Sequence, residues 1–168
     1  IIGFGRLGRL VYRYAKAFDV KTLVYDIDQS KVEQINDSVD LETLYEKSDI
    51  ISLHPKLNKS SYEMINKDSL ELMKDGVTIV NTSRGDVINS FDLIDALSSG
   101  KVSFAALDVL KNEFHSGKLP DDPLINFAND KKNLNKILIT PHAGGSTIDA
   151  HNLVFSHVAR ELNKKLNI

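Results

Sequence analysis

Short apolar runs alternate with amphipathic stretches along the whole chain. The runs that we expect to be strands cover residues 1–2, 22–25, 49–53, 77–80, 102–107 and 137–139. Runs that are apolar on both faces are typical of strands buried inside a parallel sheet. Strands that are separated by helices indicate βαβ units. The pattern therefore predicts an α/β domain built on a doubly wound parallel sheet.

The stretches between these runs carry apolar residues at helical spacing. In the first of them Leu7, Leu10, Val11 and Tyr14 fall on one face of a helix. Further helices are expected over residues 41–47, from Asn66 or Asp68 to Met73, over residues 90–100, and from Ser146 or Thr147 to about Leu166. Asparagine, aspartate, serine and threonine are common at helix starts because their side chains accept hydrogen bonds from the first N–H groups.

A glycine motif follows the first apolar run directly. Gly3, Gly5 and Gly8 form G-x-G-x-x-G, and the motif leads into the first predicted helix. In a dinucleotide site the first glycine permits a tight turn, the second lets a pyrophosphate approach the backbone, and the third lets the helix pack on the strand. The amino terminus of the helix offers N–H groups to the phosphates. Glycines in a turn are more often only a turn, but the strand and helix around these three predict a Rossmann dinucleotide-binding fold.

An acidic residue stands where such a fold recognises the adenosine ribose. Asp26 ends the second apolar run, eighteen residues after Gly8. A carboxylate at this place binds the ribose hydroxyls of NAD and would repel the extra phosphate of NADP. The alternatives are that Asp26 only opens a turn-rich loop, or that Asp28 takes its place.

Polar candidates stand at the ends of the later strands, where ligands bind in parallel sheets. They are His54, Arg84, Asp108 and His142, with Glu113 shortly after Asp108. Oxidation of a hydroxyl-bearing carbon by hydride removal needs a base for the hydroxyl proton, and histidine titrates in the right range. A neighbouring carboxylate would favour its protonated form, and an arginine could hold a substrate carboxylate by two hydrogen bonds. Taken singly, Arg84 could be a surface residue and His142 a structural one.

Composition narrows the class of protein. The 168 residues are 42% hydrophobic and 26% charged, as expected of one globular domain. The net charge of −2 gives no basic surface for nucleic acid or an anionic membrane. Cysteine is absent, which excludes disulfides and thiolate nucleophiles and is compatible with a cytoplasmic location. No apolar run is long enough for a membrane span, and no spacing of His, Asp and Glu predicts a metal site.

Four motifs carry a resemblance to a known family. They are the glycine motif with Asp26, Asn81-Thr82-Ser83-Arg84-Gly85, Ala106-Leu107-Asp108-Val109 followed by Glu113, and Thr140-Pro141-His142-Ala143-Gly144-Gly145-Ser146-Thr147. In this order they resemble the NAD-binding domain of the D-isomer-specific 2-hydroxyacid dehydrogenases, and most closely the D-3-phosphoglycerate dehydrogenase branch. The resemblance covers essentially the whole chain.

The resemblance implies NAD as cofactor and hydride transfer between nicotinamide and a D-2-hydroxy acid or 2-keto acid, with 3-phosphoglycerate among the candidates. It implies that Arg84 binds the substrate carboxylate, that His142 is the acid/base, and that Glu113 pairs with His142 and tunes it. It also implies two sets of cofactor contacts. Those on the pyrophosphate and adenosine side are Gly3, Gly5, Arg6, Leu7, Gly8 and Asp26, and those on the nicotinamide side are Pro55, Thr82, Asp108, His142, Ala143, Gly144 and Gly145.

The sequence departs from the family pattern in three places. His54-Pro55-Lys56-Leu57 has its proline one position earlier than the usual His-x-Pro-Leu, and Phe114 stands where a proline often follows the glutamate. Residues 115–136 form a longer segment than in compact members. This segment is expected to be a loop that covers the cleft or contacts another subunit, or else a plain extended surface loop.

The resemblance also carries expectations about the whole protein. In the family a substrate domain precedes the glycine motif and closes over the nicotinamide, so residues 1–168 are expected to be an NAD-binding domain without it. Such a chain should bind cofactor weakly and turn over little, because closure completes the site. The family implies a homodimer formed largely through this domain, including residues 90–100. One alternative is a module that senses NAD(H) and recruits partners. Another is a Rossmann domain for a different nucleotide, such as S-adenosylmethionine.

Overall fold

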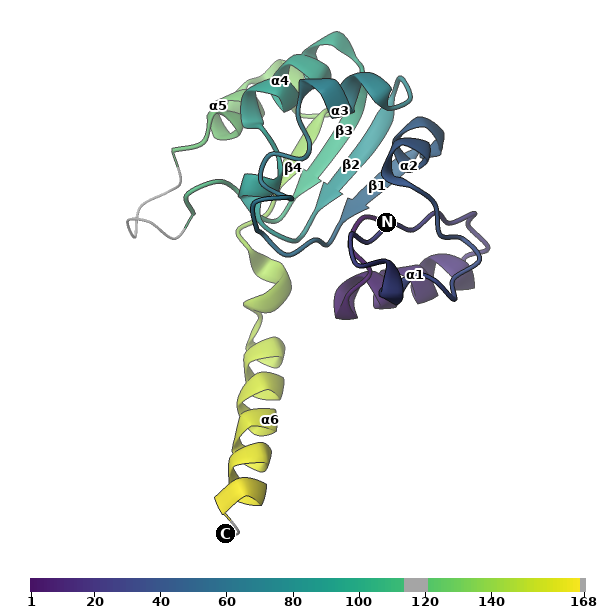
Figure 1. Ribbon diagram of the computed structural model, residues 1–168. Helices are drawn as coiled ribbons and strands as arrows, with labels where there is room; N and C mark the ends of the chain where they lie inside the picture. Colours follow the sequence, from purple (N-terminus) through teal and green to yellow (C-terminus); the bar gives the residue numbers. More distant parts are fainter. Residues whose placement is uncertain (114–120, 167–168) are drawn as a thin grey trace.

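A four-stranded parallel sheet forms the centre of the molecule. The computed structural model describes residues 1–113 and 121–166. The strands are β1 (Ile50–Leu53), β2 (Val77–Asn81), β3 (Val102–Leu107) and β4 (Ile137–Ile139), and they lie side by side in the order β1-β2-β3-β4 (Figure 1). Leu53 pairs with Asn81, Asn81 with Leu107, and Leu107 with Ile139, so the carboxyl ends of all four strands lie in register at one edge. The predicted α/β class with a parallel sheet is confirmed.

The first two predicted strands are single bridges rather than strands. Ile2 forms a parallel bridge to Tyr25 on one side and to Leu53 on the other. Its N–H donates to the carbonyl of Ser52 at 2.9 Å, and its own carbonyl accepts from the N–H of His54 at 2.8 Å. The prediction of strands here is corrected, because the chain turns away at Gly3 directly after Ile2, and in the second run Val24 bridges to Ser38 while Tyr25 bridges to Ile2. The sheet order nevertheless reverses at Ile2, since the chain goes first to Tyr25 on one side and then to β1 on the other.

Six α-helices connect or flank the strands. They are α1 (Arg6–Ala17), α2 (Leu41–Lys47), α3 (Lys67–Leu72), α4 (Ser90–Ser99), α5 (Pro123–Asn129) and α6 (Ile148–Leu166) within the described ranges. Asp40 caps α2 by accepting from the N–H of Thr43, and Asn66, not Asp68, caps α3 through a reciprocal pair with Ser69. Asn89 caps α4, which ends at Gly100 in the left-handed conformation. The helices expected at these places are confirmed.

One face of the sheet is covered by helices and forms the main core. Ile51, Leu53, Ile79, Ala105 and Leu107 point into this core and are buried. Helix α4 packs on α3, on α5 and on β3, and α5 packs on β4. On the opposite face Ile50 and Leu138 are exposed. The covered face holds the strands firmly, so the loops at their carboxyl ends are well supported.

Part of the segment at 115–136 is helical, which corrects the expectation of an extended loop. Asp122 caps α5 by accepting from the N–H of Leu124 at 3.0 Å, and Pro123 begins the helix. The 3-10 turn η3 (Lys131–Asn133) follows, and α5 packs on α4 and β4. Phe114 and His115 lie outside the described residues. A helix of seven residues carries too little periodicity to be recognised from sequence alone.

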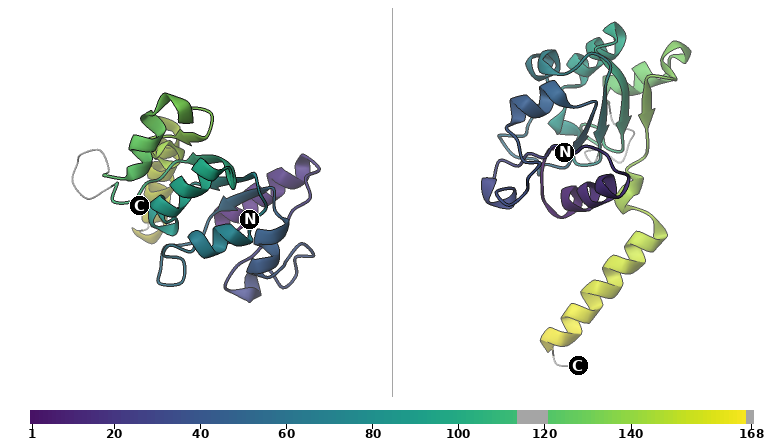
Figure 2. Two further views of the ribbon diagram at one scale, coloured as in Figure 1. Left: turned by 90° about the horizontal axis from the view of Figure 1, so that it is seen from above. Right: turned by 90° about the vertical axis from the view of Figure 1, so that its right-hand side faces the viewer.

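The last helix stands apart from the sheet. Helix α6 extends away from the other elements, as the views in Figures 1 and 2 show, and none of its residues is buried. It begins at Ile148, after Thr147, whose hydroxyl accepts from the N–H of Ala150 at 3.1 Å. The predicted final helix is confirmed. Among the described residues, no helix has the length and apolar character needed to cross a membrane.

Candidate functional site

The glycine motif forms a tight turn at the point where the sheet order reverses. Gly3 has φ +92°, and a Cβ there would lie 2.6 Å from the carbonyl carbon of His54. A Cβ on Gly8 would lie 2.0 Å from the carbonyl oxygen of Gly3, so helix α1 approaches the turn more closely than any side chain allows. Gly5 is different, because a Cβ there would meet nothing within 4 Å. The backbone around Gly5 is therefore open to an external ligand.

A cavity of about 330 Å³ lies beside this turn. Its lining includes Gly3, Gly5, Asp26, Lys31, His54 and Pro55. Asp26 is buried, and one of its carboxylate oxygens accepts from the N–H of Phe4 at 2.7 Å. The other oxygen accepts from the N–H of Asp28 at 2.9 Å and from the ammonium of Lys31 at 3.1 Å. The structure thus brings the predicted Asp26 and Pro55 to the glycine turn, while Arg6 and Leu7 lie exposed on the first turn of α1.

His54 lies in the same cavity without a full set of partners. Its Nε2 is 2.9 Å from the hydroxyl of Ser52, and its buried Nδ1 has no hydrogen-bond partner among the described residues. Burial lowers the pKa of His54 to about 4, so the imidazole is neutral at neutral pH. A buried polar atom without a partner is uncommon in proteins, and this one belongs to a residue that lines the cavity beside the glycine turn.

A buried asparagine shapes the turn that carries Arg84. The side-chain oxygen of Asn81 accepts from both the N–H and the hydroxyl of Ser83, and its NH₂ donates to the carbonyl of Arg84 at 3.0 Å. Arg84 itself is exposed, and its guanidinium donates to the carbonyl of Ser83 at 2.6 Å. Thr82 is exposed on the same turn. The turn is rigid while the arginine remains accessible to a ligand.

Asp108 organises the loop that contains His142. Its carboxylate accepts from the N–H groups of Ala143 and Gly144 at 2.8 Å and 2.9 Å, and from the hydroxyl of Thr140. Burial by itself would raise the pKa of Asp108, but these hydrogen bonds together lower the pKa below its usual value. The carboxylate of Asp108 is thus directed at the loop backbone, and Gly144 lies close against it.

Glu113 and His142 form a direct pair at this edge of the sheet. One carboxylate oxygen of Glu113 is 2.8 Å from Nδ1 of His142, and the other accepts from the N–H of Leu110 at 3.1 Å. His142 has φ +52°, a backbone conformation that is uncommon for a residue with a side chain. The two residues are 29 positions apart in sequence, and β3 and β4 bring them together. The arrangement can orient an imidazole and stabilise positive charge on it.

Close backbone packing joins the arginine turn to the glutamate loop. A Cβ on Gly85 would lie 2.0 Å from the carbonyl carbon of Leu110. The turn that carries Arg84 therefore rests directly on the loop that carries Glu113. Arg84, Glu113 and His142 therefore lie on loops that follow the neighbouring strands β2, β3 and β4.

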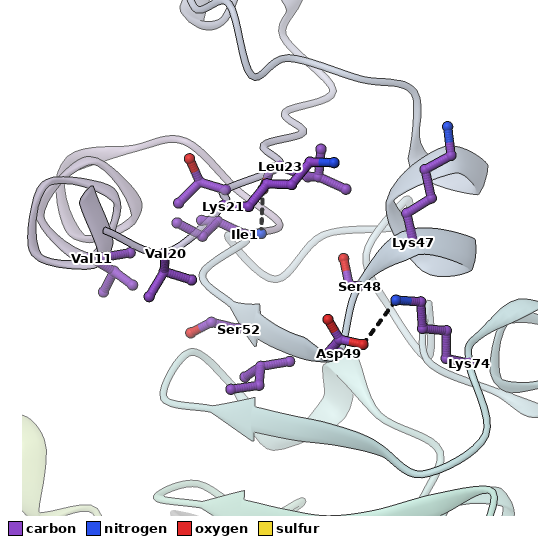
Figure 3. Close-up of a pocket in the computed structure, with 13 residues that line it drawn as sticks. Ile1, Val11, Val20, Lys21, Leu23, Lys47, Ser48, Asp49, Ser52 and Lys74 are labelled. Atoms are coloured by element: carbon purple, nitrogen blue, oxygen red, sulfur yellow. Dashed lines mark hydrogen bonds and ion pairs between the residues drawn. The ribbon is translucent and has the colours of Figure 1, made fainter. Parts of the chain in front are cut away.

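Two further cavities lie away from the cavity beside the glycine turn. One of about 710 Å³ is lined mainly by apolar residues of α5 and β4 and reaches Glu113, Pro141 and His142. The other, of about 520 Å³, is shown in Figure 3 and lies at the amino ends of the strands, between α1 and β1. It contains the ion pair of Lys74 and Asp49 at 2.8 Å but none of the predicted site residues. In residues 1–113 and 121–166 no group of three or more His, Asp or Glu could hold a metal ion.

Sequence reasoning gave no role to three residues that shape these sites. Asn81 is the last residue of β2, and its position at the end of an apolar run could have drawn attention to it. Thr140 follows a strand, and its hydroxyl bonds Asp108. No sequence motif marks Lys31. Its ammonium reaches Asp26 only because of the way the loop folds.

Comparison with known proteins identifies the family. Residues 1–144 match the family model described as "D-isomer specific 2-hydroxyacid dehydrogenase, NAD binding domain". The chain belongs to this family. Its fold is accordingly that of an NAD-binding domain, and NAD is the family's cofactor. The resemblance inferred from the four motifs is confirmed.

Individual relatives carry different activities in their names. The chain is 38% identical to a hydroxypyruvate reductase of Thermotoga maritima over 168 residues, which is all of this chain and 52% of the relative. It is 36% identical to a D-3-phosphoglycerate dehydrogenase of Archaeoglobus fulgidus over 96% of this chain and 29% of the relative. A D-lactate dehydrogenase of Aquifex aeolicus, solved with NAD and lactic acid, superposes with a TM-score of 0.80 at 31% identity, covering 99% of this chain and 52% of that one. The chain thus spans about half the length, or less, of these relatives.

Proposed function

We propose that this chain is the cofactor-binding half of an oxidoreductase that transfers a hydride between NAD and a D-2-hydroxy acid or its 2-keto acid. The contact between Glu113 and His142 at 2.8 Å is the observation that carries the proposal. A dinucleotide fold alone would not need a carboxylate held against an imidazole at the strand ends. The residues present also fit the cofactor, because the open backbone at Gly5 and the carboxylate of Asp26 line one cavity.

In this proposal His142 moves the proton of the reaction. Nδ1 is directed at Glu113, so Nε2 is the ring nitrogen that exchanges a proton with the substrate oxygen. During oxidation Nε2 accepts the hydroxyl proton, and during reduction it donates a proton to the carbonyl oxygen. Glu113 holds the ring in one orientation and stabilises the positive charge that the ring gains. NAD, when bound, supplies the hydride acceptor or donor.

Arg84 is proposed to bind the substrate carboxylate. Its exposed guanidinium stands on a turn made rigid by Asn81, and a guanidinium can hold a carboxylate by two parallel hydrogen bonds. The proposed cofactor contacts on the adenosine side are Gly3, Gly5, Arg6, Leu7, Gly8 and Asp26. On the nicotinamide side Pro55, Thr82 and residues 142–145 are proposed as contacts. Asp108 acts there by holding the loop at 140–144 in place.

The proposal also covers the class of substrate acid and the oligomeric state of the protein. Relatives named for hydroxypyruvate, glyoxylate, lactate and phosphoglycerate all match at 36% to 40% identity, so the class of 2-hydroxy acids is proposed and no single member. The sensing module is not favoured, because these relatives are named as enzymes.

We also propose that the segment present in the longer relatives supplies the domain that closes over the site, and that the protein is a homodimer.

The first test measures turnover in the natural protein that contains this chain. NADH oxidation with a panel of 2-keto acids, including 3-phosphohydroxypyruvate, should reveal one preferred acid. His142→Ala should then lower kcat by a factor of about a hundred or more, because the proton transfer loses its donor. The matched control is His157→Ala, which removes an exposed histidine of α6. Equal activity in the two variants would remove His142 from the reaction.

A further inference from the structure

Asp122 is a buried carboxylate to which the proposed reaction gives no role. It is 3% exposed and caps helix α5. Asp40 caps α2 and Asp130 caps the turn η3 in the same way, but both of these aspartates are exposed. Burial of a carboxylate costs free energy unless hydrogen bonds compensate for the lost water, and a helix cap does not require burial. Capping alone therefore does not explain the place of Asp122.

The two carboxylate oxygens of Asp122 bind different parts of the fold. Oδ1 accepts from the N–H of Leu124 at 3.0 Å, which is the cap of α5. Oδ2 accepts from the hydroxyl of Ser90, at the start of α4, at 3.1 Å and from the N–H of Lys111 at 3.2 Å. These three donors are uncharged, and the charge of the carboxylate strengthens each hydrogen bond. Asp122 thus joins α5, α4 and the loop after β3 at one point.

The loop bound in this way is the one that carries Glu113. Lys111 lies two positions before Glu113, and Asn112 between them has φ +58°. The N–H of Leu110 donates to the carboxylate of Glu113 at 3.1 Å. The left-handed conformation is uncommon for residues with a side chain and persists where the surroundings hold it. The hydrogen bond from Lys111 to Asp122 supplies such a constraint directly before this turn.

A second contact holds the side chain of Lys111. Its ammonium pairs with one carboxylate oxygen of Glu63, and the other oxygen accepts from the side chain of Asn89, the cap of α4, at 3.2 Å. This pair reaches the loop through the long flexible side chain of a lysine, whereas Asp122 binds the backbone itself. Of the two contacts, the hydrogen bond to Asp122 is the one that fixes the backbone of the loop.

We propose that Asp122 is a positioning residue for the pair of Glu113 and His142. By holding the backbone of Lys111, it keeps the carboxylate of Glu113 against Nδ1 of His142. The inference deepens the proposed function and rests on it for the role of His142. Without Asp122 the loop can shift, and Glu113 then no longer holds the ring in one orientation or stabilises its positive charge.

The first test is kinetic and uses the natural protein that contains this chain, with the variant Asp122→Ser. Serine is also a good helix cap, so α5 keeps its first hydrogen bond, but the shorter side chain cannot replace Oδ2. With the preferred 2-keto acid, kcat should fall by about tenfold or more while KM changes by less than about threefold, because the displaced pair impairs proton transfer rather than binding.

The pH profile separates this effect from a general loss of structure. In the reduction, His142 must be protonated to donate to the carbonyl oxygen. The pH at which kcat falls to half its maximum on the alkaline side should move down by about half a unit or more in Asp122→Ser, because the protonated ring loses the neighbouring carboxylate.

A second measurement tests the contact without turnover. Long-range ¹H–¹⁵N NMR spectra of the imidazoles at alkaline pH show which ring nitrogen carries the proton, and the variant His142→Ala assigns the signal. In the unaltered protein the proton should lie on Nδ1, because Glu113 accepts it. In Asp122→Ser a mixture of the two tautomers should appear.

The matched control is Asp40→Ser. Asp40 caps α2, a helix of seven residues like α5, by accepting from the N–H of Thr43 at 2.7 Å. This variant should leave kcat, the pH profile and the tautomer unchanged. Asp122→Asn keeps the size of the side chain and takes the place of the serine variant if that variant does not fold. Its amide has one oxygen where the carboxylate has two, so it should change both readouts in the same direction.

The inference is wrong if the folded Asp122 variants keep the pH profile and the tautomer of the unaltered protein, even where kcat falls. It is also wrong if Nδ1 of His142 carries no proton in the unaltered protein. Absence of turnover with every 2-keto acid overturns the proposed function, whereas normal turnover with an unchanged tautomer in Asp122→Ser overturns the inference alone.

Discussion

The three glycines of the motif differ in whether their surroundings would leave room for a side chain. The three glycines of the motif look alike in sequence, yet only two are confined by the fold. A side chain at Gly3 or Gly8 would collide with backbone atoms, while Gly5 faces open space. Gly3 and Gly8 allow the close packing of the backbone in this turn, while the free space at Gly5 leaves room for a ligand.

This contrast gives a matched pair of substitutions. Gly8→Ala should destabilise the domain by about 3 kcal/mol or more, because its methyl group would meet the carbonyl oxygen of Gly3 at 2.0 Å. Gly5→Ala should leave the free energy of unfolding within about 1 kcal/mol of the unaltered chain but weaken NADH binding by about tenfold or more. Denaturant unfolding and NADH titration measure the two effects. An unaltered NADH affinity in Gly5→Ala would contradict the proposed approach of the pyrophosphate.

Protonation of His54 should make the free energy of unfolding depend on pH. The pKa of His54 is about 4 in the folded chain and about 6.5 when it is unfolded. Between these values the unfolded chain takes up a proton that the folded chain does not, so stability is lost as the pH falls from about 6.5 to about 4. The loss from this group over that interval should be about 3 kcal/mol.

Urea unfolding at several pH values between 7 and 4 checks this expectation. His54→Gln cannot take up the proton, so its free energy of unfolding should fall less over this interval than that of the unaltered chain. His157→Gln, at an exposed position, should follow the unaltered chain. Identical slopes in all three would show that His54 is not the group responsible.

At the scale of elements, helices α4 and α6 show that a segment can be helical without packing on the core. Helix α4 has a cap at Asn89, a glycine stop at Gly100 and a buried face with Leu93 and Leu97. Helix α6 is almost twice as long, but every one of its residues is outside the core, including Phe155 and Leu162. Most helical stability in proteins comes from packing of an apolar face rather than from intrinsic propensity.

Hydrogen exchange should therefore distinguish these two helices in this chain. Amides of α6 should exchange at least about a hundredfold faster than those of α4 and β2, because α6 can unwind without opening the core. Exchange monitored by NMR or mass spectrometry at constant pH gives the comparison. Protection of α6 equal to that of α4 would mean that its apolar residues are covered in solution, by the exposed sheet face or by a second molecule.

At the scale of the whole molecule, the sheet decides which groups meet. The strands β2, β3 and β4 deliver Arg84, Glu113 and His142 to one edge, and the reversal of strand order at Ile2 places the glycine turn beside β1. In open parallel sheets this reversal is the place where ligands bind. The cavity beside the glycine turn and the Glu113–His142 pair therefore follow from one topology.

The sequence by itself determined the elements with strong periodicity and the residues at their ends. The strands at Val102–Leu107 and Ile137–Ile139 and the helix at Leu41–Lys47 lie where the apolar pattern predicts them, because burial imposes a spacing that can be read along the chain. The family also follows from motifs that are local in sequence. Helix α5 was missed because its seven residues carry little periodicity and its stability comes from contacts with α4 and β4.

Only the tertiary structure decided which side chains face one another. The contact of Glu113 with His142, the bonds of Asp108 to residues 140–144 and the ion pair of Lys31 with Asp26 join separate loops. Hydrogen bonds and ion pairs depend on distances of a few ångströms, and spacing along the chain does not set those distances between different elements. The sequence therefore predicted an NAD-binding site, while the fold alone revealed the lysine beside Asp26, the acid that we propose binds the ribose.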